Sequence, residues 1–193
     1  MSIAKAIGAS EDAASGRAAR PDGIDSVSLD PPSNVAAVVG GDELRELMRR
    51  FPAGVGVVGV DLEGERVGLT IGTLTPLSLE PPLVGFAVRR EAALHELLRR
   101  SGTFGVSLLA AGQEAVAQHF ARGVPPIALW EGVSAREGEG PPLLEGAIGW
   151  LTGRVSAEVP AGEDTFFVGE VLSVEEGARE RPLVYVDRTY ITA

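Results

Sequence analysis

The chain has 193 residues, a formal net charge of −10 and no cysteine. Its length favours one domain, and its acidity disfavours a nucleic-acid partner because phosphate contacts dominate that kind of binding. The lack of thiols excludes disulfides, thiolate catalysis and iron–sulfur clusters, and two histidines are too few for a His-rich metal site, so no metal is expected.

The N-terminal segment, residues 1–40, is rich in Ala, Ser, Gly, Asp and Pro and has no sustained periodicity. Such a composition predicts a disordered or loosely docked tail, and the alternative is an arm that crosses onto a partner subunit. The segment lacks the apolar core of a signal peptide, and no later run approaches the roughly 18 apolar residues of a membrane span. We therefore expect a cytoplasmic protein without a membrane partner, whose folded domain covers residues 41–193.

From residue 42 onward, short helical and strand-like segments alternate. Residues 42–51 place apolar side chains at helical spacing, and Asp42 is expected to cap that helix. Residues 54–60 and 66–71 predict two paired strands around a turn, with Gly64 in the left-handed conformation. The later segments are predicted as a loop over 70–78 and a strand over 83–88. A helix over 91–102 follows, with Leu94, Leu97 and Leu98 at helical spacing and Gly102 as its C-terminal stop. Beyond it, we expect a strand over 104–109, a helix over 112–121, a loop-rich stretch over 122–146, and β segments over 147–159, 165–175 and 182–186.

Many strands joined by tight turns, with short helices between them, predict a mainly β fold that closes into an antiparallel barrel. The most informative stretch is GLTIGTLTPLSLEPPLVGFAV, residues 68–88, where an apolar strand leads into small residues and hydroxyls before a second strand. This stretch resembles the flavin-binding signature of the flavin reductase-like family, the FMN-binding split-barrel proteins with a Greek-key antiparallel barrel. The resemblance extends over residues 42–193 and includes RRFPAGVGVVGV (49–60), HELLRRSGTFGVSLLAAGQEAVAQHFA (95–121), PLLEGAIGWLTGRV (142–155), GEDTFFVGEV (162–171) and RPLVYVDRTY (181–190).

The family resemblance implies an NAD(P)H-dependent flavin reductase that supplies reduced FMN or FAD to a partner monooxygenase. It also implies a homodimer with flavin and nicotinamide nucleotide as ligands. In this family the loop after the second strand wraps the flavin, which needs small residues so that main-chain N–H groups can approach the cofactor. The resemblance therefore assigns flavin contacts to Thr70, Ile71, Gly72, Thr73, Thr75, Leu77 and Ser78.

Other candidate flavin contacts lie outside this loop. Arg89 and Arg90 are expected to bind the flavin phosphate, because a guanidinium fork suits phosphate geometry. The alternative for both is a solvated pair at a strand end. His95 matches a family histidine beside the flavin, with a helix-surface position as its alternative. Tyr185 and Tyr190 fall on C-terminal strand segments that run close to the cofactor in the family.

Several positions depart from the family pattern. Gly72 and Thr73 replace an asparagine and a serine, and Pro76 removes one backbone donor. Ala92 and Leu94 replace a serine and a threonine that lie near the phosphate in the family. Together these changes leave a second function open, in which the barrel has lost flavin reduction and acts as a binding, assembly or new-ligand protein.

The candidate catalytic residue is Asp164, in the sequence Glu163-Asp164-Thr165. It replaces a family histidine that lies over the flavin, where the nicotinamide stacks. Its carboxylate would add negative charge near the redox ring and disfavour an anionic reduced flavin. The alternative is that Asp164 only shapes a turn.

Overall fold

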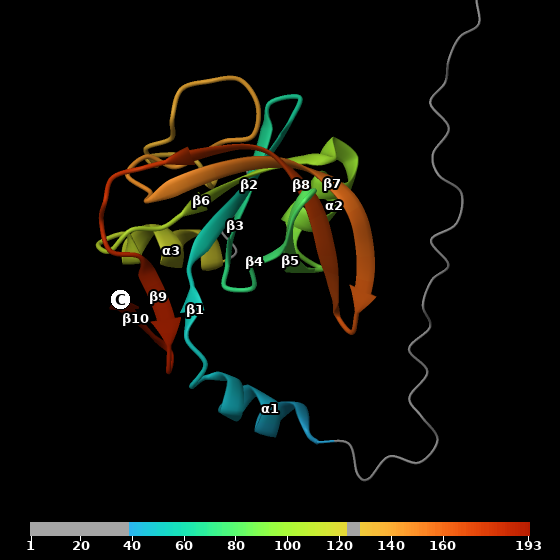
Figure 1. Ribbon diagram of the computed structural model, residues 1–193, viewed down its shortest axis with the longest axis vertical. Helices are drawn as coiled ribbons and strands as arrows, with labels where there is room; N and C mark the ends of the chain where they lie inside the picture. Colours follow the sequence, from blue (N-terminus) through green and yellow to red (C-terminus); the bar gives the residue numbers. More distant parts are fainter. Residues whose placement is uncertain (1–38, 123–127) are drawn as a thin grey trace, which may run out of the picture. The chain divides into compact units, whose positions relative to one another are not determined.

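The computed structural model describes residues 39–122 and 128–193, so the expectations for residues 1–38 lie outside the described residues. The described part is a β-rich domain with short helices (Figure 1). None of the helices in these two ranges has the length and apolarity to cross a membrane. The elements in chain order are α1 (Gly41–Met48), β1 (Ala53–Gly54), β2 (Gly56–Leu62), β3 (Glu65–Ile71), β4 (Thr75–Leu79), β5 (Pro82–Arg89), α2 (Ala93–Ser101), β6 (Thr103–Leu108), α3 (Glu114–Ala121), β7 (Gly149–Ala161), β8 (Asp164–Glu176), β9 (Leu183–Val186) and β10 (Thr189–Thr192).

Seven strands form one antiparallel sheet in the order β3-β2-β6-β7-β8-β5-β4. The β2–β3, β4–β5 and β7–β8 pairs are neighbours along the chain, whereas β2–β6 and β5–β8 join strands that are distant in sequence. The sheet curves strongly, and β1, β9 and β10 form a second sheet of three strands beside it (Figure 1). This arrangement confirms the mainly β architecture predicted from the strand spacing.

The core is built around three fully buried phenylalanines, Phe86, Phe104 and Phe167. The rings of Phe86 and Phe104 meet edge to face, with centroids 5.1 Å apart. Phe104 also covers the backbone of two glycines on neighbouring strands: a Cβ on Gly153 of β7 would lie 2.6 Å from Phe104 Cζ, and one on Gly169 of β8 would lie 2.3 Å from it. Because such a contact is impossible without a shift, glycine at both positions lets β7 and β8 approach this ring.

Helix α2 packs against β2 through the apolar stripe that its sequence predicted. Leu94, Leu97 and Leu98 are all buried, which confirms the helical spacing of residues 91–102. The predicted stop at Gly102 is also confirmed. Gly102 has φ +67°, and its N–H donates to the Leu98 carbonyl at 2.9 Å, a left-handed helix end that glycine adopts without steric cost.

Helix α1 begins earlier than predicted, so the expectation that Asp42 caps it is wrong. The N-cap is Gly40, whose N–H donates to the Glu43 carboxylate at 3.3 Å. Asp42 lies in the first turn, where the helix dipole favours an acid, and pairs with Arg45 at 2.6 Å. All eight residues of α1 are exposed, including the apolar Leu44.

The connection after β3 is shorter than predicted. Residues 72–74 form the turn, and Thr75–Leu79 form strand β4, so the loop predicted over 70–78 is wrong for its second half. Thr75 faces Gly85 and Pro76 faces Val84 across the ladder with β5. Because β4 lies at the edge of the sheet, Pro76 can occupy it without breaking a ladder on its outer side.

Candidate active site

A pocket of about 280 Å³ lies where the end of β3 meets the β9–β10 hairpin. Two aromatic rings, Tyr185 and Tyr190, form one wall, with centroids 5.0 Å apart. The volume lies just below the roughly 300–1,000 Å³ of ordinary ligand pockets, so it suits a ring system rather than a whole nucleotide. This tyrosine pocket is lined by Ala53, Val55, Thr70, Ile71, Gly72, Ala121, Tyr185 and Tyr190.

Four predicted site residues come together in the tyrosine pocket: Thr70, Ile71, Gly72 and Tyr185. The Thr70 hydroxyl donates to the Ala117 carbonyl at 2.7 Å, which ties α3 to β3. Its oxygen still has lone pairs to accept a hydrogen bond from a ligand. Thr70 therefore has both a structural contact and a remaining binding capacity.

A fifth predicted residue, Tyr190, is half-buried in the same wall. Burial raises the pKa of the Tyr190 phenol, and Tyr185 adds a smaller contribution in the same direction. The phenol is therefore neutral at physiological pH and available as a donor. The spacing of Tyr185 and Tyr190 across a short turn was a usable signal, because the two residues face each other in the β9–β10 register.

Thr73 joins this pocket to β5. Its hydroxyl accepts the Ala87 N–H at 3.0 Å and lies 3.5 Å from the Ala87 carbonyl. Ala87 lies two residues before Arg89, a spacing of about 7 Å along a strand. The turn at residues 72–74 therefore runs from the tyrosine pocket toward the end of β5.

The other predicted loop residues, Thr75, Leu77 and Ser78, lie on strand β4 rather than on a loop. The Thr75 hydroxyl donates to the Pro76 carbonyl at 3.4 Å, and the Ser78 hydroxyl accepts the Glu80 N–H at 3.2 Å. Both hydroxyls thus stabilise the β4–β5 hairpin itself. Leu77 is 45% exposed, and none of these three side chains lines the tyrosine pocket.

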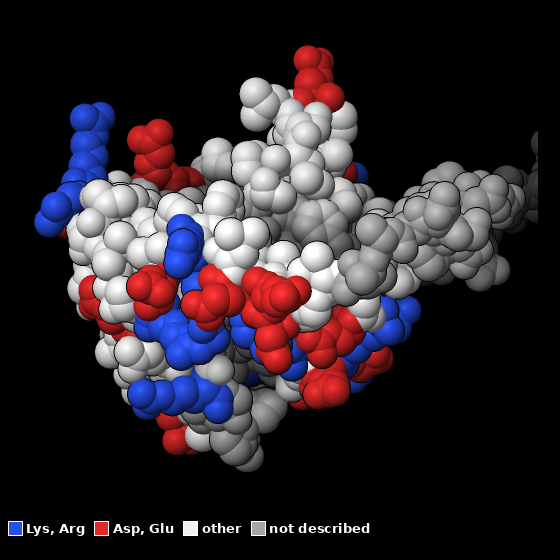
Figure 2. Space-filling view, turned by 90° about the horizontal axis from the view of Figure 1, so that it is seen from below, with Lys and Arg blue, Asp and Glu red and all other residues white. Residues whose placement is uncertain are grey.

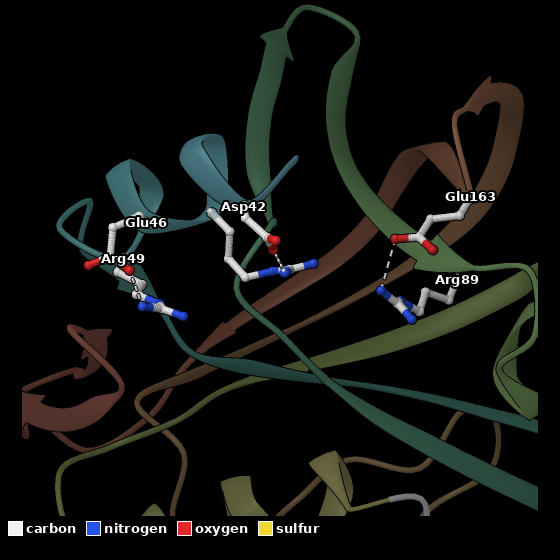
Figure 3. A network of polar contacts seen from close by, with 6 residues as sticks. Asp42, Glu46, Arg49, Arg89 and Glu163 are labelled. Atoms are coloured by element: carbon white, nitrogen blue, oxygen red, sulfur yellow. Dashed lines mark hydrogen bonds and ion pairs between the residues drawn. The ribbon is translucent and has the colours of Figure 1, made fainter. Parts of the chain in front are cut away.

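A second group, which we name the arginine end, consists of Arg89 and Arg90 at the end of β5, of Glu163 in the β7–β8 turn and of Asp164 at the start of β8. Arg89 Nη2 lies 2.9 Å from Glu163 Oε1, and Figure 3 shows the two side chains reaching toward each other. Arg90 donates from its backbone N–H to the Glu163 carbonyl at 3.2 Å and from its guanidinium to the Asp164 carbonyl at 3.3 Å. The strand ends are therefore held together while both guanidinium groups stay exposed.

Asp164 begins β8 directly opposite Arg89 in the strand register. This position places the candidate catalytic carboxylate at the arginine end, away from the residues that line the tyrosine pocket. The alternative interpretation, in which Asp164 shapes a turn, also fits this position, because the Asp164 carbonyl accepts a hydrogen bond from Arg90. Asp164 thus shapes the start of β8 through its backbone, and its side chain belongs to the arginine end.

His95 is buried rather than on the helix surface, with 9% of its surface exposed. Its Nε2 lies 2.9 Å from the Thr165 hydroxyl, and its ring meets Phe167 edge to face at 5.4 Å. These contacts tie α2 to the start of β8. His95 therefore packs inside the domain and holds the start of β8, which carries Asp164 of the arginine end.

Charged side chains of both signs alternate over the face seen in Figure 2. On α1 the pairs are Arg45 with Asp42 and Arg49 with Glu46, also drawn in Figure 3. A surface of this kind lacks the continuous basic stripe that phosphate backbones need. A single phosphate, in contrast, needs only a local pair of cations, which Arg89 and Arg90 supply.

The chemistry of these groups fits a flavin nucleotide. The tyrosine pocket offers apolar and aromatic walls for a ring, Thr70 and Thr73 offer hydroxyls, and the arginine end offers cations for a phosphate. A bound flavin would supply the redox chemistry, and the protein would supply binding and orientation.

Comparison with known proteins agrees with this geometry. The sequence pattern of the family described as "Flavin reductase like domain" matches residues 48–193. The chain therefore belongs to the flavin reductase-like domain family, which confirms the resemblance inferred from the sequence.

Three relatives illustrate what this chain is similar to. The reductase component of 4-hydroxyphenylacetate 3-monooxygenase from Thermus thermophilus is 42% identical over 77% of this chain and 94% of its own length. The NADH:FMN oxidoreductase of Rhodococcus erythropolis is 32% identical over 77% of this chain and 79% of its own. The solved structure of the NADH:FAD oxidoreductase of Streptomyces globisporus C-1027, in complex with NAD and FAD fragments, is 33% identical, with a TM-score of 0.74 over 81% of this chain and 96% of its own.

Proposed function

We propose that this protein is an NADH-dependent flavin reductase that delivers reduced FMN or FAD to a separate monooxygenase. The observation that carries the proposal is a path of suitable groups along the fold, from the tyrosine pocket through the turn at Thr73, which bonds to Ala87 of β5, to the arginine end of that strand. The relatives support it, because they are named as flavin reductases and as reductase components of monooxygenases.

Each end of the path has its own role in the proposal. The tyrosine pocket holds the isoalloxazine ring, where Tyr185 stacks and Gly72 leaves room for close approach. Thr73 contacts the ribityl chain, and Thr70 accepts a hydrogen bond beside it. Arg89 and Arg90 bind the phosphate.

Hydride transfer depends on stacking and orientation more than on an acid or a base. The carboxylate of Asp164 therefore does not abstract a proton in this proposal. It adds negative potential at the arginine end, where the phosphate binds in this proposal, and this potential disfavours a bound anion. Its effect is to promote the transfer of the reduced flavin away from the protein.

A homodimer is part of the same proposal. Helix α1 presents an apolar face on which Leu44, Leu47 and Met48 are 56%, 66% and 48% exposed. Apolar side chains at helical spacing that join no core among residues 39–122 and 128–193 are typical of a surface that a partner covers. A second copy of this chain, in a flavin reductase homodimer, is that partner. The cytoplasmic location stays a prediction.

A flavin titration followed by a turnover assay tests the function. Quenching of flavin fluorescence should give saturable binding of FMN or FAD, and NADH should be oxidised only when flavin is present. NADPH in place of NADH measures the nicotinamide preference. No binding at millimolar flavin would contradict the proposal and favour the second function, a barrel that has lost flavin reduction.

A further inference from the structure

We propose that Glu163 competes with the flavin phosphate for Arg89, and that this competition keeps FMN weakly bound and easily released. The inference rests on the proposed function, since it concerns the phosphate end of the same site. It assigns Glu163 a positioning role through Arg89, which neither the family resemblance nor the predicted site residues included. A reductase that passes its flavin to another enzyme needs such a release device.

The geometry holds Glu163 where it can compete. Its carboxylate oxygen Oε1 lies 2.9 Å from Arg89 Nη2. Its backbone carbonyl accepts the Arg90 N–H at 3.2 Å, so the turn that carries Glu163 is anchored to the end of β5. The Glu163 side chain therefore extends from an anchored backbone position beside Arg89, whose charge it neutralises.

The ion pair is also easy to open. The side chains of Arg89 and Glu163 are 60% and 71% exposed, and exposed pairs contribute little to stability because water screens them. A phosphate monoester carries about two negative charges and offers a fork-like guanidinium more acceptor oxygens than one carboxylate. Phosphate can therefore displace Glu163, and the displaced carboxylate then lies near an anion of the same sign.

Asp164, the acid next to Glu163, contacts Arg90 rather than Arg89. The carbonyl of Asp164, rather than its carboxylate, accepts the Arg90 guanidinium at 3.3 Å. The ion pair between Glu170 and Arg154, at 2.7 Å, connects β8 to β7 away from the arginine end, with the Glu170 side chain 33% exposed. Glu170 is therefore a control for the loss of one arginine-paired carboxylate elsewhere on β8.

The test compares FMN with riboflavin, which has the same ring and ribityl chain but no phosphate. Fluorescence titrations of the full chain would give a Kd for each ligand in the wild type, in Glu163→Gln and in Glu170→Gln. We expect Glu163→Gln to lower the Kd for FMN by about twofold to fivefold and to leave the Kd for riboflavin unchanged. Glu170→Gln should change neither value.

A double-mutant cycle with Arg89→Gln separates competition from simple charge repulsion. If Glu163 acts through Arg89, the gain in FMN affinity from Glu163→Gln should shrink when Arg89 is already replaced. Equal shifts for FMN and riboflavin would mean that Glu163 only shapes the turn, and would overturn the inference. An unchanged FMN to riboflavin ratio in a variant that still oxidises NADH with flavin would overturn it as well, while the proposed function stands. A wild type that binds neither flavin would overturn both.

Discussion

The tyrosine pocket and the arginine end are assembled by different physical means. The pocket rests on buried neighbours, with Val55 and Ile71 each 5% exposed, and on hydroxyls already bonded to backbone. At the arginine end, the paired side chains of Arg89 and Glu163 are both more than half exposed. Packing therefore preforms the tyrosine pocket, whereas ionic competition adjusts the phosphate affinity of the arginine end. A carrier of a transferable flavin gains from this difference, because its affinity can be weakened at one end without disturbing the geometry of the other.

The largest expected effect is on stability and concerns His95, which holds the start of β8 at the arginine end. His95→Ala removes a buried ring and its bond to Thr165, so we expect the free energy of unfolding to fall by about 2–4 kcal/mol. Urea denaturation at neutral pH would measure this loss. Thr165→Val, which keeps the shape and removes only the hydroxyl, should cost about 1–2 kcal/mol. Unchanged stability with a selective loss of FMN affinity would show instead that the imidazole acts on the ligand.

The next effect concerns flavin affinity and tests the tyrosine pocket alone. Gly72→Leu places a side chain against Ala53, since a Cβ on Gly72 would already lie 3.2 Å from Ala53 Cβ, and both residues line the tyrosine pocket. We expect the Kd values of FMN and riboflavin to rise together by about tenfold or more. Leu172→Ala, at an exposed position on β8, is the control and should leave both values unchanged. A rise for FMN alone would place the ring outside this pocket.

Salt should separate the two ends without any mutation. Exposed charges are screened over about 10 Å at 0.1 M ionic strength. Raising the salt from about 0.02 to 0.2 M is therefore expected to weaken FMN binding by about threefold, while riboflavin binding stays nearly constant. Titrations of both ligands over a salt series would measure the slopes. Equal slopes for FMN and riboflavin would contradict electrostatic binding of the phosphate at the arginine end.

The sequence predicted the fold better than the site, for reasons visible in particular residues. Leu94, Leu97 and Gly102 act locally, so helical spacing and a left-handed stop were enough to place α2. The extent of β4 depended on pairing with β5, a contact that no short-range pattern contains, and Pro76 argued against a strand.

The site predictions divide along the same line. Thr70, Ile71 and Gly72 line the pocket because they end one strand, whereas Tyr185 reaches it from a distant hairpin that only the family resemblance indicated. Neither the burial of His95 nor the pairing of Glu163 with Arg89 follows from local sequence, because both depend on how the start of β8 meets β5 and α2.

The smallest effect is a pH dependence carried by the tyrosine pocket. Burial raises the pKa of Tyr190 above its ordinary value of 10.0. The neutral phenol is thus favoured in the folded state, and the stabilisation is fully present below about pH 10 and lost as the pH rises through the higher folded value. Few other groups titrate there, since the chain has no cysteine and Lys5 is its only lysine. Urea denaturation at pH 9, 10 and 11 should show a decline in the free energy of unfolding that Tyr190→Phe makes shallower. An identical decline in that variant would mean that the pocket does not restrict ionisation, and the wall that it shares with Tyr185 would then be open to water.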